Sequence, residues 1–233
     1  MPARPLVLAH RGASRRAPEN TIEAFRLARE LGADGVELDV RRTSDGVLVV
    51  HHDAEIDGFG LIAAAPFEAL RAARPSVPTL TDALDATTDM LVNVEIKCLP
   101  WEQDADPEHH VAHQVVDLVR AAGTDVVLSS FDLGAVDACR SIAPELPTAW
   151  LTHGQDVMTA AAIAAERGHT WLHPDRATVM TSPVGATDAC HMRGLRIDVW
   201  TVDDPAEMRQ LAAAGADGLI TNTPDVALAA LGR

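Results

Sequence analysis

Short apolar runs alternate along the chain with longer segments whose apolar residues recur at helical spacing. The run Leu6 to Ala9 predicts a first strand. A helix follows from 22 to 31, with Asn20 as its expected cap and Gly32 at its end. Such alternation indicates a parallel sheet with crossover helices. The pattern predicts strands at 6–9, 35–40, 90–96, 126–129, 148–152, 170–173, 196–202 and 218–221, and helices at 22–31, 66–74, 79–87, 108–122, 132–142, 156–167, 182–193, 204–214 and from 224.

The number of these units predicts the fold. The apolar run Gly46 to His51 follows the second strand too closely for a crossover, so we interpret it as an extra hairpin. Eight strands and eight crossover segments remain, which fits an α/β fold of the (β/α)8 TIM-barrel type with its site at the C-terminal ends of the strands. A doubly wound sheet is the alternative, but it would usually show a Gly-rich turn after the first strand, where this chain has only Gly12. No linker divides the chain, so we predict one domain over residues 1–233.

The composition excludes some classes of ligand. The net charge of −15 argues against general binding to nucleic acid or to anionic membranes. It leaves room for an anionic small-molecule substrate, because a bound divalent cation reverses the local potential of a carboxylate-lined site. No apolar run approaches the roughly 20 residues that span a bilayer, and Cys98, Cys139 and Cys190 match neither a disulfide framework nor a zinc spacing. With no room for a signal peptide before the first strand, we expect a cytoplasmic protein without membrane insertion; the pattern predicts no oligomeric state.

Carboxylates lie near the ends of two predicted strands. Glu37 and Asp39 are two residues apart on a strand, so they share one face, which points into a barrel. Two such carboxylates repel unless a cation lies between them, and hard divalent cations prefer oxygen ligands. Glu95 ends another strand and is the candidate third ligand. The alternative is pairing of the first two with Arg41 and Arg42, which fits exposed residues better than charges in so apolar a run.

Histidines and an arginine follow two other strand-like runs. His10 is suited to shuttle a proton near neutral pH, Arg11 to hold a phosphate through two parallel hydrogen bonds, and Gly12 to let the backbone approach a ligand closely. His51 and His52 are adjacent on an extended run, so only one of them can face the site. The residues that alternate with each are equally apolar, and periodicity does not choose between them.

Three further features complete the candidate site. Lys97 is the only lysine among 19 basic residues and shares a strand face with Glu95, which indicates a role for an ammonium group, although an exposed strand-end lysine is the alternative. Trp200 fits either barrel packing or a wall against an apolar substrate group, and we include it among the substrate-binding candidates. The segments 129–131 and 221–224 also end strands and offer hydroxyl or amide contacts.

A series of short segments between residues 10 and 224 matches the motifs of one known family. In chain order they are His10-Arg-Gly, Pro18-Glu-Asn-Thr-Ile-Glu-Ala-Phe, Gly35-Val-Glu-Leu-Asp-Val with Thr43 and Asp45, Val50-His-His-Asp, Val77-Pro-Thr-Leu, Asn93-Val-Glu-Ile-Lys, Ser129-Ser-Phe, Val199-Trp-Thr-Val and Ala216-Asp-Gly-Leu-Ile-Thr-Asn-Thr-Pro. The chain resembles the glycerophosphodiester phosphodiesterases over nearly its whole length.

This resemblance implies a TIM barrel that hydrolyses deacylated phospholipids, such as glycerophosphocholine and glycerophosphoethanolamine, to an alcohol and sn-glycerol 3-phosphate. It also implies one divalent cation, Mg²⁺ or Ca²⁺. The matching ligand positions are Glu37, Asp39 and Glu95; the general acid/base pair is His10 and His52; and the phosphate contacts are Arg11 and Lys97. The choice of His52 over His51 comes from the resemblance alone.

The chain departs from the family pattern after Asp53. The family usually has a Thr-rich, Gly-containing stretch there and a small inserted region over the site, whereas this chain has a short or truncated insertion after its second strand. We therefore expect a more open site. Two alternatives follow: a lysophospholipase D-type activity on a diester that keeps one acyl chain, and a catalytically silent phosphoester-binding barrel. The nucleophile is either water or the substrate's own 2-hydroxyl.

Overall fold

The computed structural model describes residues 4–97 and 99–233, and in it eight parallel strands close into a barrel. β1 pairs with β2 on one side and with β11 on the other, which closes the ring, as the sequence predicted. The order around the barrel is β1, β2, β6, β7, β8, β9, β10, β11. The strand bounds are β1 Leu6–His10, β2 Gly35–Arg42, β6 Leu91–Ile96, β7 Val126–Ser130, β8 Thr148–Thr152, β9 Trp171–Pro174, β10 Arg196–Val199 and β11 Gly218–Thr221.

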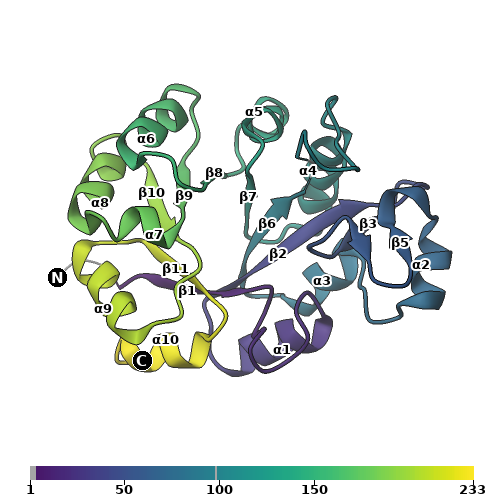
Figure 1. Cartoon of the computed structure of the whole chain (residues 1–233), viewed down its shortest axis with the longest axis horizontal. Coiled ribbons are helices and arrows are strands. Elements are labelled where there is room, and N and C mark those ends of the chain that lie inside the picture. The colour runs from purple at the N-terminus through teal and green to yellow at the C-terminus, as the bar shows by residue number, and fades with distance from the viewer. Residues whose placement is uncertain (1–3, 98) are drawn as a thin grey trace.

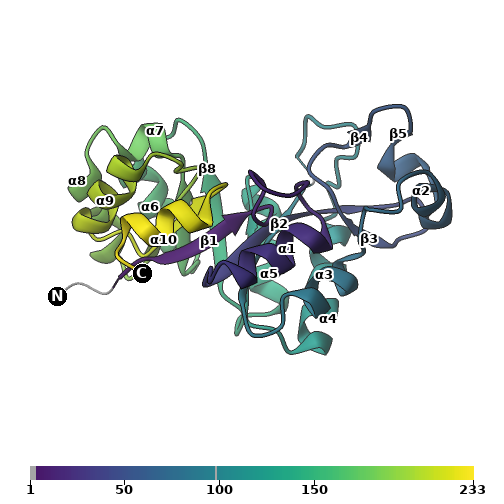
Figure 2. The same cartoon turned by 90° about the horizontal axis from the view of Figure 1, so that it is seen from below.

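Helices surround the strands, as Figures 1 and 2 show. Each predicted helix is present within a few residues of its expected bounds, and two short helices, η1 and α7, were not predicted. The bounds are α1 Ile22–Glu30, η1 Ile62–Ala64, α2 Phe67–Ala73, α3 Leu80–Ala86, α4 His110–Ala122, α5 Leu133–Ile142, α6 Val157–Glu166, α7 Arg176–Val179, α8 Pro183–His191, α9 Pro205–Ala214 and α10 Pro224–Ala230.

The chain leaves the β/α alternation between β2 and α3. β3 (Leu48–Val50) runs antiparallel to β2, which confirms the extra hairpin. After it come β4 (Glu55–Ile56) and β5 (Gly60–Leu61), which form a second small hairpin, then η1 and α2. These elements form the short insertion, which extends to one side of the barrel in Figure 1.

The two faces of the strands have different environments. Apolar residues such as Val36, Leu38 and Val94 belong to the core cluster that also includes residues of the surrounding helices. On the inner face, Val127, Ala149 and Trp171 form an apolar cluster deep in the barrel. Toward the C-terminal ends of β2 and β6 the inward-facing residues are the carboxylates Glu37, Asp39 and Glu95. The fold therefore gathers these three carboxylates at one end of the barrel.

The cap of α1 and the end of β10 differ from the sequence-based expectations. Thr21, not Asn20, caps α1, because its side-chain oxygen accepts a hydrogen bond from the backbone N–H of Ala24. The strand predicted at 196–202 ends at Val199. Cys139 and Cys190 are buried free thiols, and Cys98 lies outside the described residues. Within the described chain, no helix combines the length and apolar character needed to cross a bilayer.

Candidate active site

Three buried carboxylates meet at the C-terminal end of the barrel. Glu37 and Asp39 come from β2 and Glu95 from the neighbouring β6, where Asp39 and Glu95 are paired in register. The exposed fractions of these residues are 3%, 0% and 6%. One oxygen from each carboxylate lies within 4.8 Å of the others. Period-two alternation explains this cluster, because it directs all three side chains to the inner face.

Two cations lie beside this carboxylate cluster. The Lys97 ammonium nitrogen lies 2.6 Å from Glu95 Oε1 and 3.2 Å from Asp39 Oδ1, and the residue is only 6% exposed. The alternative of an exposed strand-end lysine is therefore wrong. Arg11 lies with its Nε 3.3 Å from Asp39 Oδ2, and its backbone N–H donates to Glu37 Oε2 at 3.0 Å. Both groups lie where they can contact an anion bound over the cluster.

The proposed pairing of the β2 carboxylates with Arg41 and Arg42 is also wrong. The Arg41 side chain, 1% exposed, instead forms ion pairs with Glu102 at 3.0 Å and Asp104 at 2.5 Å. Its Nε donates to the backbone carbonyl of His52 at 2.8 Å. Arg41 therefore joins the end of β2 to the His52 segment and to the loop after β6. Sequence reasoning missed this role, since both acids lie about sixty residues away in the chain.

Burial and mutual repulsion perturb the carboxylates differently. Burial, reinforced by the Asp39 charge, raises the pKa of Glu37 to about 8. Burial also raises the pKa of Glu95 to about 7, although the Lys97 charge opposes the rise. Burial alone would raise the pKa of Asp39 too, but Lys97 and Arg11 outweigh it and hold this pKa below its usual value. Full ionisation of all three carboxylates is therefore disfavoured beside only two cations, and a further positive charge at the cluster would favour it.

The cluster fits a hard divalent cation. All its donors are carboxylate oxygens, which Mg²⁺ and Ca²⁺ prefer. Glu37 Oε1 is buried and accepts no hydrogen bond from the described residues. A buried charged oxygen without a partner is costly, and a coordinated ion removes that cost. Glu37, Asp39 and Glu95 are therefore the residues that could hold the metal.

Two histidines flank the carboxylates. His10 Nδ1 lies 2.7 Å from Asn222 Oδ1, and its Nε2 lies 3.9 Å from Glu37 Oε2. Burial, together with the Arg11 charge, lowers the pKa of His10. His52 Nδ1 lies 2.7 Å from Asp53 Oδ1, and burial lowers the pKa of His52 although the Asp39 charge opposes this. Both lowered pKa values favour neutral imidazoles, which can accept a proton near pH 7.

The geometry separates the two adjacent histidines. His52 lines the cavity over the carboxylates, whereas His51 is absent from that lining and its Nδ1 lies 3.0 Å from the backbone carbonyl of Asp53. Both residues follow the end of β3 at Val50, and only His52 reaches the cavity.

A cavity of about 50 Å³ lies over the cluster. Its ionisable lining residues are His10, His52, Arg11, Lys97, Glu37 and Glu95. Its apolar lining includes Phe131 and Trp200, whose rings meet edge to face with centroids 5.3 Å apart. The Trp200 indole N–H donates to the His173 carbonyl at 2.9 Å, which fixes the ring as a wall of the cavity. A ligand here meets both charged groups and apolar surface.

Two further residues support the site and were not recognised in these roles from the sequence. Asn20 donates from Nδ2 to Asp39 Oδ2 at 2.7 Å. The residue type was the available signal, because Asn adopts the left-handed backbone conformation, here φ +57°, more readily than most residues. Gly12 has φ +80°, and a Cβ there would lie 2.7 Å from Ala24 atoms of α1. The close approach that the structure shows at Gly12 is therefore to the helix.

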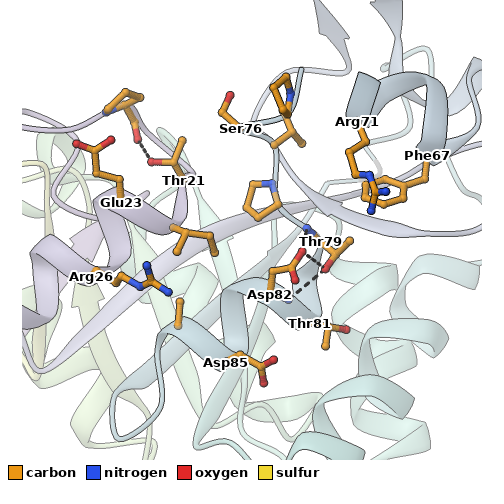
Figure 3. A pocket seen from close by; sticks show the side chains of 16 residues that line it. Thr21, Glu23, Arg26, Phe67, Arg71, Ser76, Thr79, Thr81, Asp82 and Asp85 are labelled. Atoms are coloured by element: carbon orange, nitrogen blue, oxygen red, sulfur yellow. Dashed lines mark hydrogen bonds between the residues drawn. The ribbon is translucent and has the colours of Figure 1, made fainter. Parts of the chain in front are cut away.

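A larger groove of about 840 Å³ lies outside the barrel among α1, α2 and α3. Figure 3 shows Glu23, Asp82 and Asp85 around it together with Arg26 and with Arg71, whose guanidinium lies over the Phe67 ring. The described lining contains no histidine and none of the buried carboxylates. The buried carboxylates and the two histidines of the candidate site therefore lie at the barrel end and outside this groove.

Comparisons with known proteins show the family of the chain. Residues 10–226 match the model of the glycerophosphoryl diester phosphodiesterase family. The chain belongs to this family. The matched range begins at His10 and contains every predicted site residue. The sequence-based resemblance and the prediction of a phosphodiester-hydrolysing enzyme are confirmed.

Individual relatives cover almost the whole chain. A glycerophosphodiester phosphodiesterase from Caldanaerobacter subterraneus subsp. tengcongensis is 31% identical, over 94% of this chain and 95% of the relative. The crystal structure of a glycerophosphodiester phosphodiesterase from Thermotoga maritima has 29% identity and a TM-score of 0.82, covering 99% of each chain. A phosphodiesterase from Oleispira antarctica, solved in complex with the product sn-glycerol-3-phosphate, shares the fold with a TM-score of 0.86 at 23% identity, covering 99% of this chain and 98% of that one.

Proposed function

We propose that this enzyme hydrolyses glycerophosphodiesters such as glycerophosphocholine and glycerophosphoethanolamine to an alcohol and sn-glycerol 3-phosphate, and that it needs one divalent cation, Mg²⁺ or Ca²⁺. The observation that carries the proposal is the cluster of Glu37, Asp39 and Glu95 with two cations and two histidines around it. The product complex of the Oleispira antarctica phosphodiesterase supports the assignment of the product.

The cations bind and orient the diester in this proposal. Arg11 and Lys97 converge on the carboxylate cluster from β1 and β6, so a phosphate placed over the cluster meets a guanidinium and an ammonium. Divalent Mg²⁺ or Ca²⁺, when bound, adds positive charge that offsets the carboxylates and the charge that develops on the phosphate oxygens. The Phe131–Trp200 wall excludes water from the apolar part of the cavity and packs against the carbon skeleton of the substrate.

The histidines move protons. One of His10 and His52 accepts the proton of the attacking oxygen, and the other protonates the leaving alkoxide. Their lowered pKa values favour the base role for either ring in the free enzyme. The attacking oxygen belongs to water or to the substrate's 2-hydroxyl. Normal turnover of a substrate without that hydroxyl would rule out an obligatory cyclic phosphate.

A second candidate function has one specific observation in its favour. Trp101, in the loop after β6, is 77% exposed, and Gln103 of the same loop donates to Glu55 of the insertion at 2.9 Å. An exposed indole beside the short insertion offers a surface for the acyl chain of a lysophospholipid. Lysophospholipase D activity predicts that Trp101→Ala weakens turnover of lysophosphatidylcholine and leaves turnover of glycerophosphocholine unchanged.

The proposal has three further features: the kind of partner, the domain organisation and the location. We retain a small molecule, and no nucleic acid, as the partner, because the net charge is −15. We also retain one catalytic domain over residues 1–233 and a cytoplasmic location as proposals.

A coupled assay for released sn-glycerol 3-phosphate tests the function. The parent, His10→Ala and Glu95→Gln are assayed on glycerophosphocholine with Mg²⁺, with Ca²⁺ and with EDTA. We expect turnover only with a cation, and a loss of about 10²- to 10⁴-fold in His10→Ala. Turnover that persists in EDTA would refute the metal requirement. Absence of turnover by a folded, cation-loaded parent would favour lysophospholipids or a silent binding role.

A further inference from the structure

A chain of hydrogen bonds runs from Asp203, in the loop between β10 and α9, to His10 Nδ1. Asp203 Oδ2 accepts from Asn222 Nδ2 at 2.7 Å, and Asp203 Oδ1 accepts from the Asn222 backbone N–H at 2.9 Å. Thr221 Oγ1 also donates to this carboxylate, at 3.0 Å. Asn222 Oδ1 then lies 2.7 Å from His10 Nδ1. Three elements of the barrel are joined in this way, although 212 residues separate His10 from Asn222.

The carboxylate fixes the orientation of the amide. Asp203 accepts three hydrogen bonds, so the group that faces it from Asn222 must be the donating NH₂. The amide oxygen therefore faces the imidazole. Ser14 Oγ donates to the same oxygen at 3.0 Å, which agrees with this orientation.

The amide in turn fixes the tautomer of His10. An oxygen can only accept, so His10 Nδ1 must carry the proton that it shares with Asn222. In the neutral ring the lone pair then lies on Nε2, the nitrogen 3.9 Å from Glu37 Oε2 and directed at the carboxylate cluster. The opposite tautomer would leave Asn222 Oδ1 facing the lone pair of Nδ1, which is repulsive.

We propose that Asp203 and Asn222 are positioning residues for His10: they hold its ring with Nδ1 protonated and Nε2 free to accept a proton over the cluster. This inference rests on the proposed function, in which His10 transfers a proton. Asn222 acts through His10 and Asp203 acts through Asn222. Removing either one releases the ring and mixes the tautomers, without removing any phosphate-contacting residue.

The test is a double-mutant cycle with glycerophosphocholine as substrate. Asn222→Leu keeps the branched shape of the side chain and removes the acceptor. We expect it to lower kcat by about 10- to 100-fold, as loss of an outer partner of a functional histidine typically does, with KM nearly unchanged. In the His10→Ala background the same substitution has no further effect, because the ring it positions is gone. An equal loss in both backgrounds would show a merely structural role and overturn the proposal.

Two further variants sharpen the cycle. Ser14→Ala removes a donor to the same amide oxygen and leaves the contact with His10, so its kcat stays close to that of the parent. The swapped pair Asp203→Asn with Asn222→Asp retains an acceptor toward His10 and a donor toward that acceptor. It therefore restores most of the activity that Asn222→Leu loses. A swapped pair as inactive as Asn222→Leu would contradict the proposed relay.

A spectroscopic readout does not depend on turnover. Two-bond ¹H–¹⁵N correlation spectra of the protein labelled at histidine nitrogens distinguish a protonated ring nitrogen from one with a lone pair, and His10→Ala identifies the signals of His10. We expect Nδ1 protonated in the parent and a mixture of tautomers in Asn222→Leu. A proton on Nε2 in the neutral parent would refute the inference even in an active enzyme. Absence of turnover together with the expected tautomer would instead refute the proposed function.

Discussion

Replacement of Arg41 by methionine tests how the His52 segment is held. The Arg41 side chain is 1% exposed, and its guanidinium binds Glu102, Asp104 and the His52 carbonyl. Met preserves most of the buried aliphatic volume and removes every one of these contacts. Asp104, only 6% exposed, then keeps a charge without its partner. The substitution therefore isolates the electrostatic contribution of Arg41.

The size of the loss follows from this burial. Breaking a buried ion pair by removing one partner costs about 3–5 kcal/mol. Glu102 is 24% exposed, so water recovers part of its interaction and the lower end, about 3 kcal/mol, applies. At roughly 2–4 °C for each kcal/mol in a domain of this size, Tm falls by roughly 6–12 °C.

Urea denaturation and thermal melts measure this difference directly. Arg71→Met is the matched control, because Arg71 is 61% exposed and lies 3.6 Å from an exposed Glu68. Its ion pair and its contact with the Phe67 ring are both exposed, so its stability should stay within about 1 kcal/mol of the parent. Adding Glu102→Gln and Asp104→Asn to Arg41→Met should recover part of the loss, since no unpaired charge then remains. Equal stability of Arg41→Met and the parent would refute the reasoning.

Three other outcomes are expected. In thermal melts, Mg²⁺ or Ca²⁺ at 100 times its dissociation constant should stabilise the parent by about 2.7 kcal/mol relative to EDTA. The Glu37→Gln variant should lose most of this stabilisation, and an equal stabilisation of both proteins would exclude Glu37 as a ligand. Burial raises the pKa of Asp198 to about 8, so the folded protein favours the protonated carboxyl. The protein therefore loses stability as pH rises from the usual carboxyl pKa toward 8, at up to about 1.4 kcal/mol per pH unit. Asp198→Asn removes this loss, so its Tm advantage over the parent should grow between pH 4 and 8, and a constant difference would contradict the assignment. Gly12→Ala should destabilise the protein by more than the roughly 1 kcal/mol expected for Gly123→Ala. Both glycines have positive φ, but only at Gly12 would the new Cβ clash, since it would lie 2.7 Å from atoms of Ala24. Equal urea midpoints of the two variants would contradict this.

Most of the fold could be predicted from periodicity. Apolar runs separated by helical stripes determine the order of the strands, and period-two alternation places Glu37 and Asp39 on one inner face. Elements held mainly by tertiary contacts were missed: β4 and β5 have two residues each, and α7 has four. Segments of two to four residues are too short to show a periodic pattern of apolar residues.

Site residues could be predicted where the alternation within one strand shows which side chains share a face. They were harder to predict where two contacting residues are far apart in the chain. Asn20 is of a residue type that often caps helices. In the structure its amide contacts Asp39, and Thr21 caps α1. The role of Asn222 depends on barrel closure between β1 and β11, which brings the two ends of the chain together. A local sequence pattern contains no information on such contacts. The choice between His51 and His52 likewise needed either the family resemblance or the structure.

The central claim is that this barrel end cleaves a phosphodiester bond and leaves the phosphate on glycerol. The most direct measurement is ³¹P NMR of glycerophosphocholine incubated with the cation-loaded enzyme in ¹⁸O-labelled water. We predict that the diester signal is replaced by that of sn-glycerol 3-phosphate carrying one ¹⁸O atom, and that His10→Ala and EDTA each prevent the change. An unchanged diester signal with folded, cation-loaded protein, or phosphocholine as the product, would contradict the account.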